Sequence, residues 1–417
     1  MDILTRRRFL IASGVVGAGA LAAGAATLTL SDLLATAGDR DPSGRTLVLV
    51  TLYGGNDGLN TVVPYADPAY HDTRGELAYS PDEVKRLDDT VGLNPAMTGL
   101  HGLYGQRRLA IVRGVGYPKP DRSHFRSMDI WQTANPERPG TTGWIGRWLD
   151  GVGGDPRLAV SFESAVPPLL AGERSAGASV PVAGRNRRGG LSDPTLAAFA
   201  AGSPGESPAQ ARAAACFADL RSVDQMVAEV RNAAEDAEGA EDAEDRPAAT
   251  ATGGARTSLQ AQLDLVAQCV EAGVSTRVFS VSLGGFDSHA DEKQLQAVLL
   301  GQLDRALTGF VERMDRTEAG RKVVVAVYSE FGRRVRANAS EGTDHGTASN
   351  VLLLGAGVRG GLHGAQPSLT DLDDGDLKFG VDFRDVYATL LADVLDADPA
   401  RVLDGWRGRR DDLFVPA

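Results

Sequence analysis

The hydrophobic positions of this chain gather in short runs that are apolar at nearly every position rather than at alternate ones. The runs are rich in Val, Leu and Ile, and several are followed directly by glycine or polar residues. Such runs are typical of strands that are buried on both faces, as in parallel sheets. The predicted strands span residues 46–53, 109–112, 158–162, 278–283, 323–328 and 351–354.

Between several of these runs the apolar residues recur at helical spacing. Within residues 258–272 one face carries Leu259, Leu263, Val266 and Val270. The next stretch has a second such face, formed by Leu295, Leu299, Leu303, Leu307, Phe310 and Met314. Strands that alternate with amphipathic helices predict an α/β fold, with a mainly parallel sheet sandwiched by helices.

The first residues predict an export signal of the twin-arginine type. An arginine pair lies directly ahead of Phe9 and Leu10, and an uncharged run rich in Ala, Gly, Val and Leu continues to about residue 30. Ala35 and Ala37 then offer small side chains at the two positions that a signal peptidase reads. This order predicts a cleaved signal over residues 1–37. The alternative is a transmembrane anchor, but the many Gly and Ala residues make the run only weakly hydrophobic.

Export by this route would place the protein outside the cytoplasm, in the periplasm or secreted. The twin-arginine translocase would be its partner during transit, and no stable membrane span would remain after cleavage. The rest of the chain, residues 38–417, is long enough for a single α/β domain. Residues 228–256 interrupt it with a low-complexity, partly acidic stretch that has no apolar face, which predicts a flexible insertion.

Composition narrows the class of partner. The net charge of −12 argues against nucleic acid, because binding the phosphate backbone requires a basic surface. Cys216 and Cys269 are the only cysteines, so a cysteine-rich zinc site is excluded, while pairing of the two after export stays open. The basic cluster at 185–188 has two interpretations, a solvated loop or a receiver for an anionic substrate.

Carboxylates and histidines gather in glycine-bearing loops beside the predicted strands, where ligands of α/β sheets commonly bind. Each loop holds a carboxylate, and three of them hold His124, His289 and His345, half of the six histidines in the chain. Such a mixed set suits a divalent metal such as zinc, manganese or iron. Each residue alone is better explained as a helix cap or a surface side chain, but their shared position favours a site. The loops span residues 54–58, 114–125, 284–289, 329–333 and 343–347.

One phosphate-binding motif is excluded. The sequence GAGVRG at 355–360 matches the dinucleotide fingerprint GxGxxG after a predicted strand. The following residues, 361–374, have no helical period and include Pro367. The helix N-terminus that would bind the phosphate is therefore missing.

Taken together, the loop sequences resemble a secreted bacterial family known only as a domain of unknown function, numbered 1501. The resemblance runs from about residue 45 to the C-terminus. Its motifs are GGNDGLNTVVP at 54–64, RSHFRSMDIWQT at 122–133, GFDSH at 285–289, SEFGR at 329–333 and TDHG at 343–346. The family is similar to the alkaline phosphatase and sulfatase superfamily, whose fold is an α/β sandwich around a two-metal centre. Its members commonly carry twin-arginine signals.

The resemblance implies roles for several residues. Asp57 is similar to the aspartate that opens the metal site. Ser123 is similar to the nucleophile, which lies at a helix start where the dipole and free N–H groups favour a phosphate. Asp287 and His289 are similar to the pair that binds the other metal, although the superfamily usually spaces that pair as Asp-x-x-x-His.

The end of the pattern can be aligned in two ways. In one, Asp344 and His345 match the superfamily's Asp-His-Gly. In the other, which fits the strand order better, Glu330 lies where that motif falls and His345 matches a later lone histidine. Under the second alignment Glu330 replaces an aspartate ligand and Phe331 replaces a histidine ligand. The second metal would then be weakened, or would recruit Asp344 or His124.

These implied roles describe an exported hydrolase of phosphate, phosphonate or sulfate esters with one or two divalent metal ions. The candidate catalytic residues are Ser123, His124 and Arg333. Ser123 would attack in line, and Arg333 or Arg126 would hold the charged oxygens. A simple helix N-cap is an equally open interpretation of Ser123.

Two other functions compete with this one. A non-catalytic exported protein would keep the fold and one metal and bind a cell-surface polysaccharide or a partner protein; Phe331 and the irregular pair spacing support it. A metal-dependent isomerase or mutase would need phosphorylated metabolites that are scarce outside the cell. Metal content separates the first two, because a scaffold need not hold stoichiometric metal.

Overall fold

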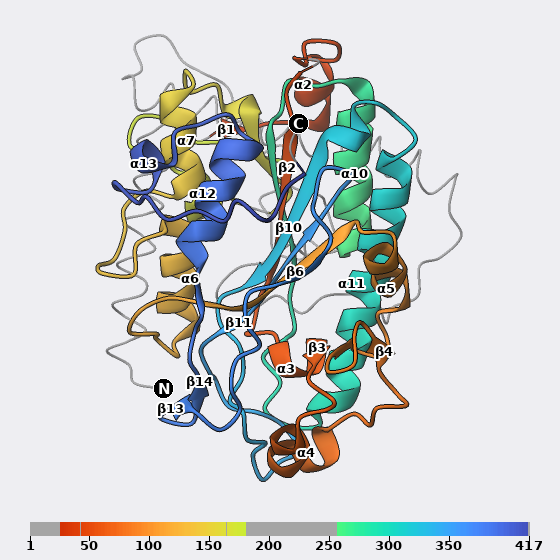
Figure 1. Cartoon of the computed structure of the whole chain (residues 1–417). Helices are drawn as coiled ribbons and strands as arrows, with labels where there is room; N and C mark the ends of the chain where they lie inside the picture. The colour runs from red at the N-terminus through yellow and green to blue at the C-terminus, as the bar shows by residue number, and fades with distance from the viewer. Residues whose placement is uncertain (1–25, 42, 164, 181–256, 416–417) are drawn as a thin grey trace, which may run out of the picture.

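A computed structural model describes residues 26–41, 43–163, 165–180 and 257–415 of the chain (Figure 1). Residues 1–25, which hold most of the predicted export signal, lie outside these ranges. So do the acidic stretch 228–256, the basic cluster 185–188 and Cys216. Among the described residues, no helix has both the length and the apolar character needed to cross a membrane.

A ten-stranded central sheet organises the fold. In spatial order its strands are β1 (Ala26–Thr27), β8 (Ala178–Ser179), β7 (Ala159–Ser161), β9 (Val278–Leu283), β2 (Thr46–Leu52), β10 (Val323–Ser329), β11 (Ser349–Leu354), β6 (Leu109–Gly116) and β12 (Gly361–His363), with β15 (Val381–Asp382) also pairing with β6. In the described sheet only β11 runs antiparallel to its neighbours. The predicted strands and the mainly parallel α/β class are confirmed.

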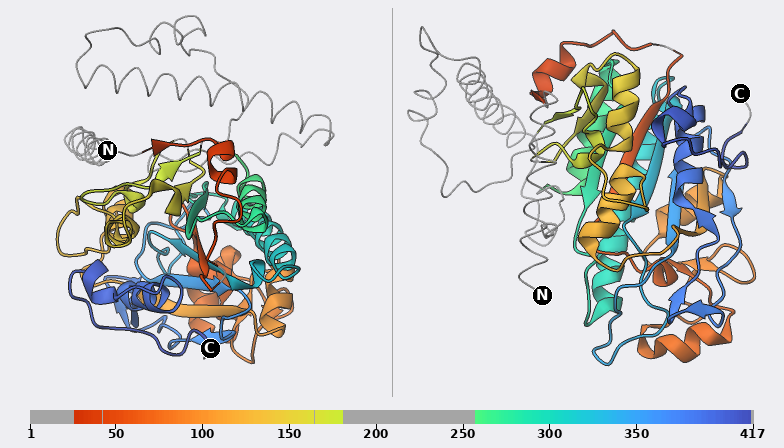
Figure 2. Two further views of the ribbon diagram at one scale, coloured as in Figure 1. Left: turned by 90° about the horizontal axis from the view of Figure 1, so that it is seen from above. Right: turned by 90° about the vertical axis from the view of Figure 1, so that its left-hand side faces the viewer.

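Helices cover both faces of the sheet (Figure 2). One face carries α5 (Thr98–Gly105), α10 (Leu259–Ala272) and α11 (Glu292–Met314), and the other carries α6 (His124–Thr133), α7 (Trp144–Gly151), α12 (Phe383–Asp393) and α13 (Pro399–Val402). In β2, Val48 and Val50 pack into the core on the α10 side, while Leu47 and Leu49 pack into the core on the α12 side. Successive side chains of a strand point to opposite faces, so a strand that is apolar throughout requires helices on both sides.

Smaller elements lie around this framework. A three-stranded sheet contains β3 (Val62–Val63), β5 (Gly92–Leu93) and β4 (Lys85–Arg86), and β13 (Leu372–Asp373) pairs with β14 (Asp376–Leu377). The remaining helices of the described residues are α2 (Leu30–Leu34), α3 (Gly58–Thr61) and α4 (Pro68–Arg74), with 3₁₀ turns at Gly75–Leu77, Pro156–Leu158, Pro168–Leu170 and Gly320–Lys322. β11 leads through a loop to β12 and not to a helix, as the rejection of the GxGxxG match predicts.

Candidate metal centre

Three neighbouring parallel strands bring the predicted loops together at one edge of the sheet. Leu52, at the end of β2, pairs with Leu283 of β9 and Ser329 of β10, and all three strands end at these residues. The loops that follow therefore begin side by side. Gly54 allows their close approach, because its φ is +115° and a Cβ there would lie 2.4 Å from the amide nitrogen of Asp287.

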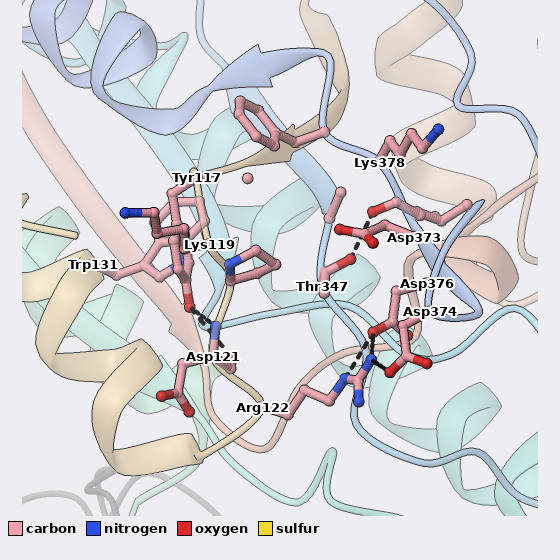
Figure 3. A pocket seen from close by; sticks show the side chains of 15 residues that line it. Tyr117, Lys119, Asp121, Arg122, Trp131, Thr347, Asp373, Asp374, Asp376 and Lys378 are labelled. Atoms are coloured by element: carbon pink, nitrogen blue, oxygen red, sulfur yellow. Dashed lines mark hydrogen bonds and ion pairs between the residues drawn. The ribbon is translucent and has the colours of Figure 1, made fainter. Parts of the chain in front are cut away.

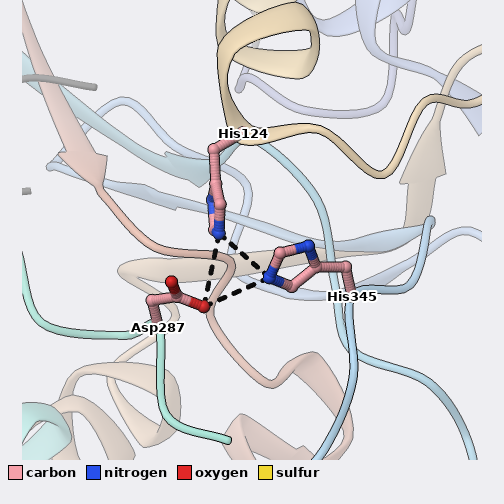
Figure 4. A group of neighbouring side chains, drawn as sticks. All are labelled: His124, Asp287 and His345. Atoms are coloured by element: carbon pink, nitrogen blue, oxygen red, sulfur yellow. Dashed lines mark hydrogen bonds and ion pairs between the residues drawn. The ribbon is translucent and has the colours of Figure 1, made fainter. Parts of the chain in front are cut away.

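The side chains of His124, Asp287 and His345 converge in this region (Figure 4). His124 is the first residue of α6, Asp287 follows β9, and His345 precedes β11. The Nε2 atoms of the two histidines are 3.0 Å apart. Asp287 Oδ1 lies 3.3 Å from Nε2 of His124 and 3.2 Å from Nε2 of His345. We call this set the triangle.

Hydrogen bonds behind the triangle fix both imidazole rings. His124 Nδ1 lies 2.8 Å from Glu330 Oε1, and His345 Nδ1 lies 2.8 Å from the carbonyl oxygen of Arg122. Both partners are acceptors, so each Nδ1 carries the proton and donates it. When each ring is neutral, the lone pair of Nε2 faces the other members of the triangle, which is the tautomer that a metal-ligating histidine requires.

The groups around the triangle shift the pKa values of His124 and Asp287. Burial lowers the pKa of His124, but hydrogen bonds and charge from Asp287 and Glu330 outweigh it and raise that pKa to about 9. Burial alone would raise the pKa of Asp287, yet hydrogen bonds from His124, His345 and Arg333 hold it well below its usual range. Asp287 is therefore ionised at neutral pH, as a metal ligand must be.

The spacing of the three donor atoms fits a divalent ion. Ligands at zinc–nitrogen distances of about 2.0–2.1 Å around a tetrahedral ion lie about 3.3 Å from one another. The edges of the triangle, 3.0, 3.2 and 3.3 Å, match this value. Three protein ligands leave one position open, which is the arrangement of catalytic zinc sites, and two histidines with one carboxylate also suit iron. The Asp287 side chain is 42% exposed, so a substrate can reach the centre.

His289 touches two members of the triangle. Its Nε2 lies 3.0 Å from Asp287 Oδ1 and 3.1 Å from Nε2 of His345. Asp344 is more remote: its Oδ1 is 3.7 Å from Nδ1 of His289, and its side chain is 62% exposed. Of these two predicted metal residues, His289 is the nearer to the triangle.

Two predicted site residues lie behind the triangle. Glu330 is predicted as a metal ligand, and Arg333 as the residue that binds the charged oxygens of a substrate. Glu330 is fully buried, and its Oε1 also accepts the N–H of Gly54 over 2.9 Å. Arg333 is 2% exposed and donates to the carbonyl oxygens of Gly54, Gly55, Phe286 and Thr343. Its Nη2 lies 3.0 Å from Asp287 Oδ1. Arg333 therefore joins the loops and orients Asp287.

Asp57 is not part of the group of ligands that the structure brings together. It is the N-cap of α3, and its Oδ1 accepts the N–H of Leu59. Both of its oxygens also bond to the guanidinium of Arg74, at 2.5 and 3.1 Å, and both side chains are fully buried. Arg74 comes from the end of α4, and nothing in the local sequence indicated this partner.

Ser123 is the N-cap residue of α6, directly before His124, and its side chain makes no capping hydrogen bond. Its backbone N–H donates to Asp121 Oδ1 over 2.7 Å. Phe331 packs against both histidine rings, with centroid distances of 4.8 Å to His124 and 5.0 Å to His345. An apolar ring therefore lies where the preferred alignment expects a histidine ligand.

A cavity of about 790 Å³ adjoins the centre on the side of Arg122 (Figure 3). The carbonyl oxygen of Arg122 accepts a hydrogen bond from Nδ1 of His345. The guanidinium of Arg122 bonds to Asp374 at 2.9 Å and to Asp376 at 2.5 Å. No sequence pattern indicated this cavity, because β6, α6 and the β13–β14 hairpin contribute to it from distant parts of the chain. Its lining includes Tyr117, Lys119, Trp131, Thr347, Lys378 and Phe379.

Comparison with known proteins gives a family and a general resemblance of fold. Residues 110–414 match the family described as "Protein of unknown function (DUF1501)". No curated protein matches the chain. A solved protein of the alkaline phosphatase superfamily from Vibrio parahaemolyticus is 11% identical, with 99% of this chain and 81% of that chain covered and a TM-score of 0.41.

Two further solved structures are similarly distant. The phosphonate monoester hydrolase of Silicibacter pomeroyi is 9% identical over 88% of this chain and 78% of its own, with a TM-score of 0.37. The murine ectonucleotide pyrophosphatase/phosphodiesterase 5 is 9% identical over 87% of this chain and 99% of its own, with a TM-score of 0.39. At these scores the resemblance is limited to the broad outline.

Proposed function

Since the chain belongs to the DUF1501 family, whose members are described as proteins of unknown function, we propose its function from the site itself. It is an exported, metal-dependent hydrolase of phosphate or sulfate esters, with Ser123 as the nucleophile. The observation that carries the proposal is the triangle: two imidazole nitrogens and one ionised carboxylate oxygen, all within 3.3 Å of one another.

The triangle would hold zinc, manganese or iron, and a single ion is the arrangement that it supports best. When bound, such an ion supplies Lewis acidity, which stabilises negative charge on the ester oxygens. His289 is placed to add a ligand. Glu330 and Arg122 orient the two histidines, and Arg333 orients Asp287.

Ser123 would act at the other side of the scissile group. Its position at the start of the ten-residue α6 places it beside helix N–H groups that favour an anion. Ser123 Oγ would form a bond to phosphorus or sulfur while the bond to the alcohol oxygen breaks, and the proton that the serine releases would leave on the alcohol. Water would then cleave the covalent intermediate and restore the hydroxyl. The adjoining cavity would receive the organic part of the ester.

The decisive experiment is metal analysis by mass spectrometry on protein purified without chelator. We expect stoichiometric metal in the wild type and its loss in His345→Ala. His101→Ala is the matched control, because His101 lies in α5 and its ring bonds to the Arg86 carbonyl oxygen. Metal-free wild type, or a His345→Ala variant that keeps its metal, would contradict the proposal.

Turnover is then measured on 4-nitrophenyl phosphate and 4-nitrophenyl sulfate. We expect Ser123→Ala to retain the metal and to lose at least a hundredfold in kcat, since a covalent nucleophile has no substitute. Unchanged kcat in this variant would exclude Ser123 as the nucleophile.

One observation favours a second function. Arg333 uses its donors on backbone carbonyls and on Asp287, so the charged group expected to hold a substrate is already occupied. The alternative is an exported, non-catalytic protein that binds metal or a cell-surface polysaccharide. Stoichiometric metal with no turnover of any phosphate or sulfate ester would support this alternative over the hydrolase.

A further inference from the structure

Two members of the triangle belong to a second set of three donor atoms, which His289 completes. Nε2 of His289 lies 3.0 Å from Asp287 Oδ1 and 3.1 Å from Nε2 of His345, and these last two atoms are 3.2 Å apart. The spacing matches the value of about 3.3 Å between the ligands of a tetrahedral zinc ion as well as the triangle does. We call this second set the outer triangle.

One ion cannot bind the donors of both sets at once. Among the described residues, the donor atoms that all lie within 4.8 Å of one another include that of His124 but not that of His289. Two ligands of one zinc ion, each at about 2.1 Å, are at most about 4.2 Å apart. In addition, Nε2 of His345 offers a single lone pair and so binds one ion at a time. The ligand that His289 adds therefore completes an alternative position for the ion.

The two positions differ in how they meet solvent and in how firmly their third ligand is held. The side chain of His289 is 46% exposed, whereas that of His124 is 17% exposed. Nδ1 of His124 bonds to the fully buried Glu330 over 2.8 Å. Nδ1 of His289 lies 3.7 Å from Oδ1 of the exposed Asp344, beyond the reach of a hydrogen bond. A hydrogen-bonded carboxylate fixes a ligating ring and raises its basicity, so the triangle is the firmer position and the outer triangle the more accessible one.

We propose that His289 is an entry ligand for the divalent ion. Together with Asp287 and His345 it binds the incoming ion, and His124 then takes its place. In this exchange the bond from the ion to Nε2 of His289 breaks and a bond to Nε2 of His124 forms, while a proton on that nitrogen passes to water. Because two ligands stay bound throughout, the ion changes one bond at a time. The inference rests on the metal-dependent function proposed above.

The test is the kinetics of zinc binding to the metal-free full chain, measured by rapid mixing against a chromophoric chelator. We expect His289→Ala to lower the rate constants of association and dissociation by at least about tenfold each and to change Kd by less than about threefold. The same path serves entry and exit, so its loss slows both. His289→Gln, which keeps a side chain of similar length without the imidazole, should behave in the same way. His101→Ala is again the control and should keep the rate constants of the wild type.

Other results would overturn the proposal. If His289 were a permanent ligand, His289→Ala would raise the dissociation rate constant and Kd and leave association almost unchanged. Unchanged rate constants in the variant would exclude any role in entry. Two zinc ions per wild-type chain would mean that both positions are filled together. A wild type that binds no zinc would instead contradict the proposed metal-dependent function itself.

The absorption spectrum of bound cobalt(II) gives a second measurement that does not depend on rates. The visible bands of this ion report the identity and geometry of its ligands. We expect the final spectrum of His289→Ala to equal that of the wild type, because the ion ends in the triangle in both. His124→Ala should hold the ion in the outer triangle and give a different spectrum. A changed spectrum in His289→Ala would place His289 among the final ligands and overturn the proposal.

Discussion

Glu330 Oε1 lies 2.8 Å from Nδ1 of His124, and the same oxygen accepts the N–H of Gly54 in the loop that follows β2. One buried carboxylate thus ties a helix N-terminus to the edge of the sheet. It also sets the tautomer of the histidine and increases the basicity of its free nitrogen.

We expect Glu330→Gln to weaken metal binding by about 10- to 100-fold, because an amide is a poorer acceptor than a carboxylate and holds the ring less firmly. Competition with a chromophoric chelator would measure the change in Kd. Glu341→Gln, at an exposed residue, is the control and should bind as the wild type does. An unchanged Kd in Glu330→Gln would mean that His124 is not a ligand.

Metal affinity should depend on pH through His124. Its pKa is raised to about 9 in the metal-free protein, so below that pH the ring must lose a proton before it can coordinate. We expect Kd to fall about tenfold per pH unit from about pH 7 to about pH 9 and then to level off. Titrations in non-coordinating buffers would check this. A Kd that is constant over this range would contradict the assignment of His124.

His124 should also make the folding stability of the metal-free protein depend on pH. This stability should fall as the pH rises, whereas the metal affinity should rise. A raised pKa means that protonated His124 stabilises the fold fully below its unfolded value of about 6.5. That contribution is lost as the pH rises through about 9. Added metal should remove the dependence, since it keeps the ring deprotonated, and thermal unfolding with and without metal would test it.

Asp57→Asn should unfold the protein more easily without removing its metal. The change leaves Arg74 fully buried without its charge partner, which costs about 3–5 kcal/mol in comparable pairs. The control is Asp82→Asn, which breaks the exposed pair with Arg86 and should cost less than about 1 kcal/mol. Urea denaturation gives the free energy of unfolding, and mass spectrometry the metal content. Loss of metal in Asp57→Asn would show that Asp57 is a metal ligand, contrary to this prediction.

The free energy of unfolding should also depend on pH through Glu292. Burial, and then the charge of Asp57, raise its pKa to about 8, although Thr343 Oγ donates to it over 2.6 Å. Between about pH 4.5 and about pH 8 the native state holds a proton that the unfolded state has lost. The free energy of unfolding therefore falls by about 1.4 kcal/mol per pH unit from this group alone.

Glu292→Gln should abolish that slope, so the variant should match the wild type near pH 4.5 and exceed its stability at pH 8. Urea denaturation of both proteins at several pH values measures the difference, in which all other titrating groups cancel. A variant that loses stability at pH 8 would show that Glu292 is needed in its charged form.

The hydrophobic pattern was sufficient for the class of fold and for the elements that carry the site. Runs such as 323–328 are apolar at every position, and only a strand covered on both faces satisfies that pattern. The pattern did not indicate that β11 runs antiparallel between β10 and β6, because strand direction depends on the path of the chain and not on side-chain periodicity.

The sequence by itself indicated that Asp287, His289 and His345 lie in loops beside strands and that His124 lies where such a loop leads into a helix, since the carboxyl ends of parallel strands meet at a common edge. The tertiary structure decided which of them meet. In the folded protein Asp57 forms an ion pair with Arg74, Arg333 donates to backbone carbonyls, and Glu330 accepts from His124. These choices depend on contacts between residues that are distant in sequence, each of which satisfies a buried charge, and a sequence pattern carries no record of such partners.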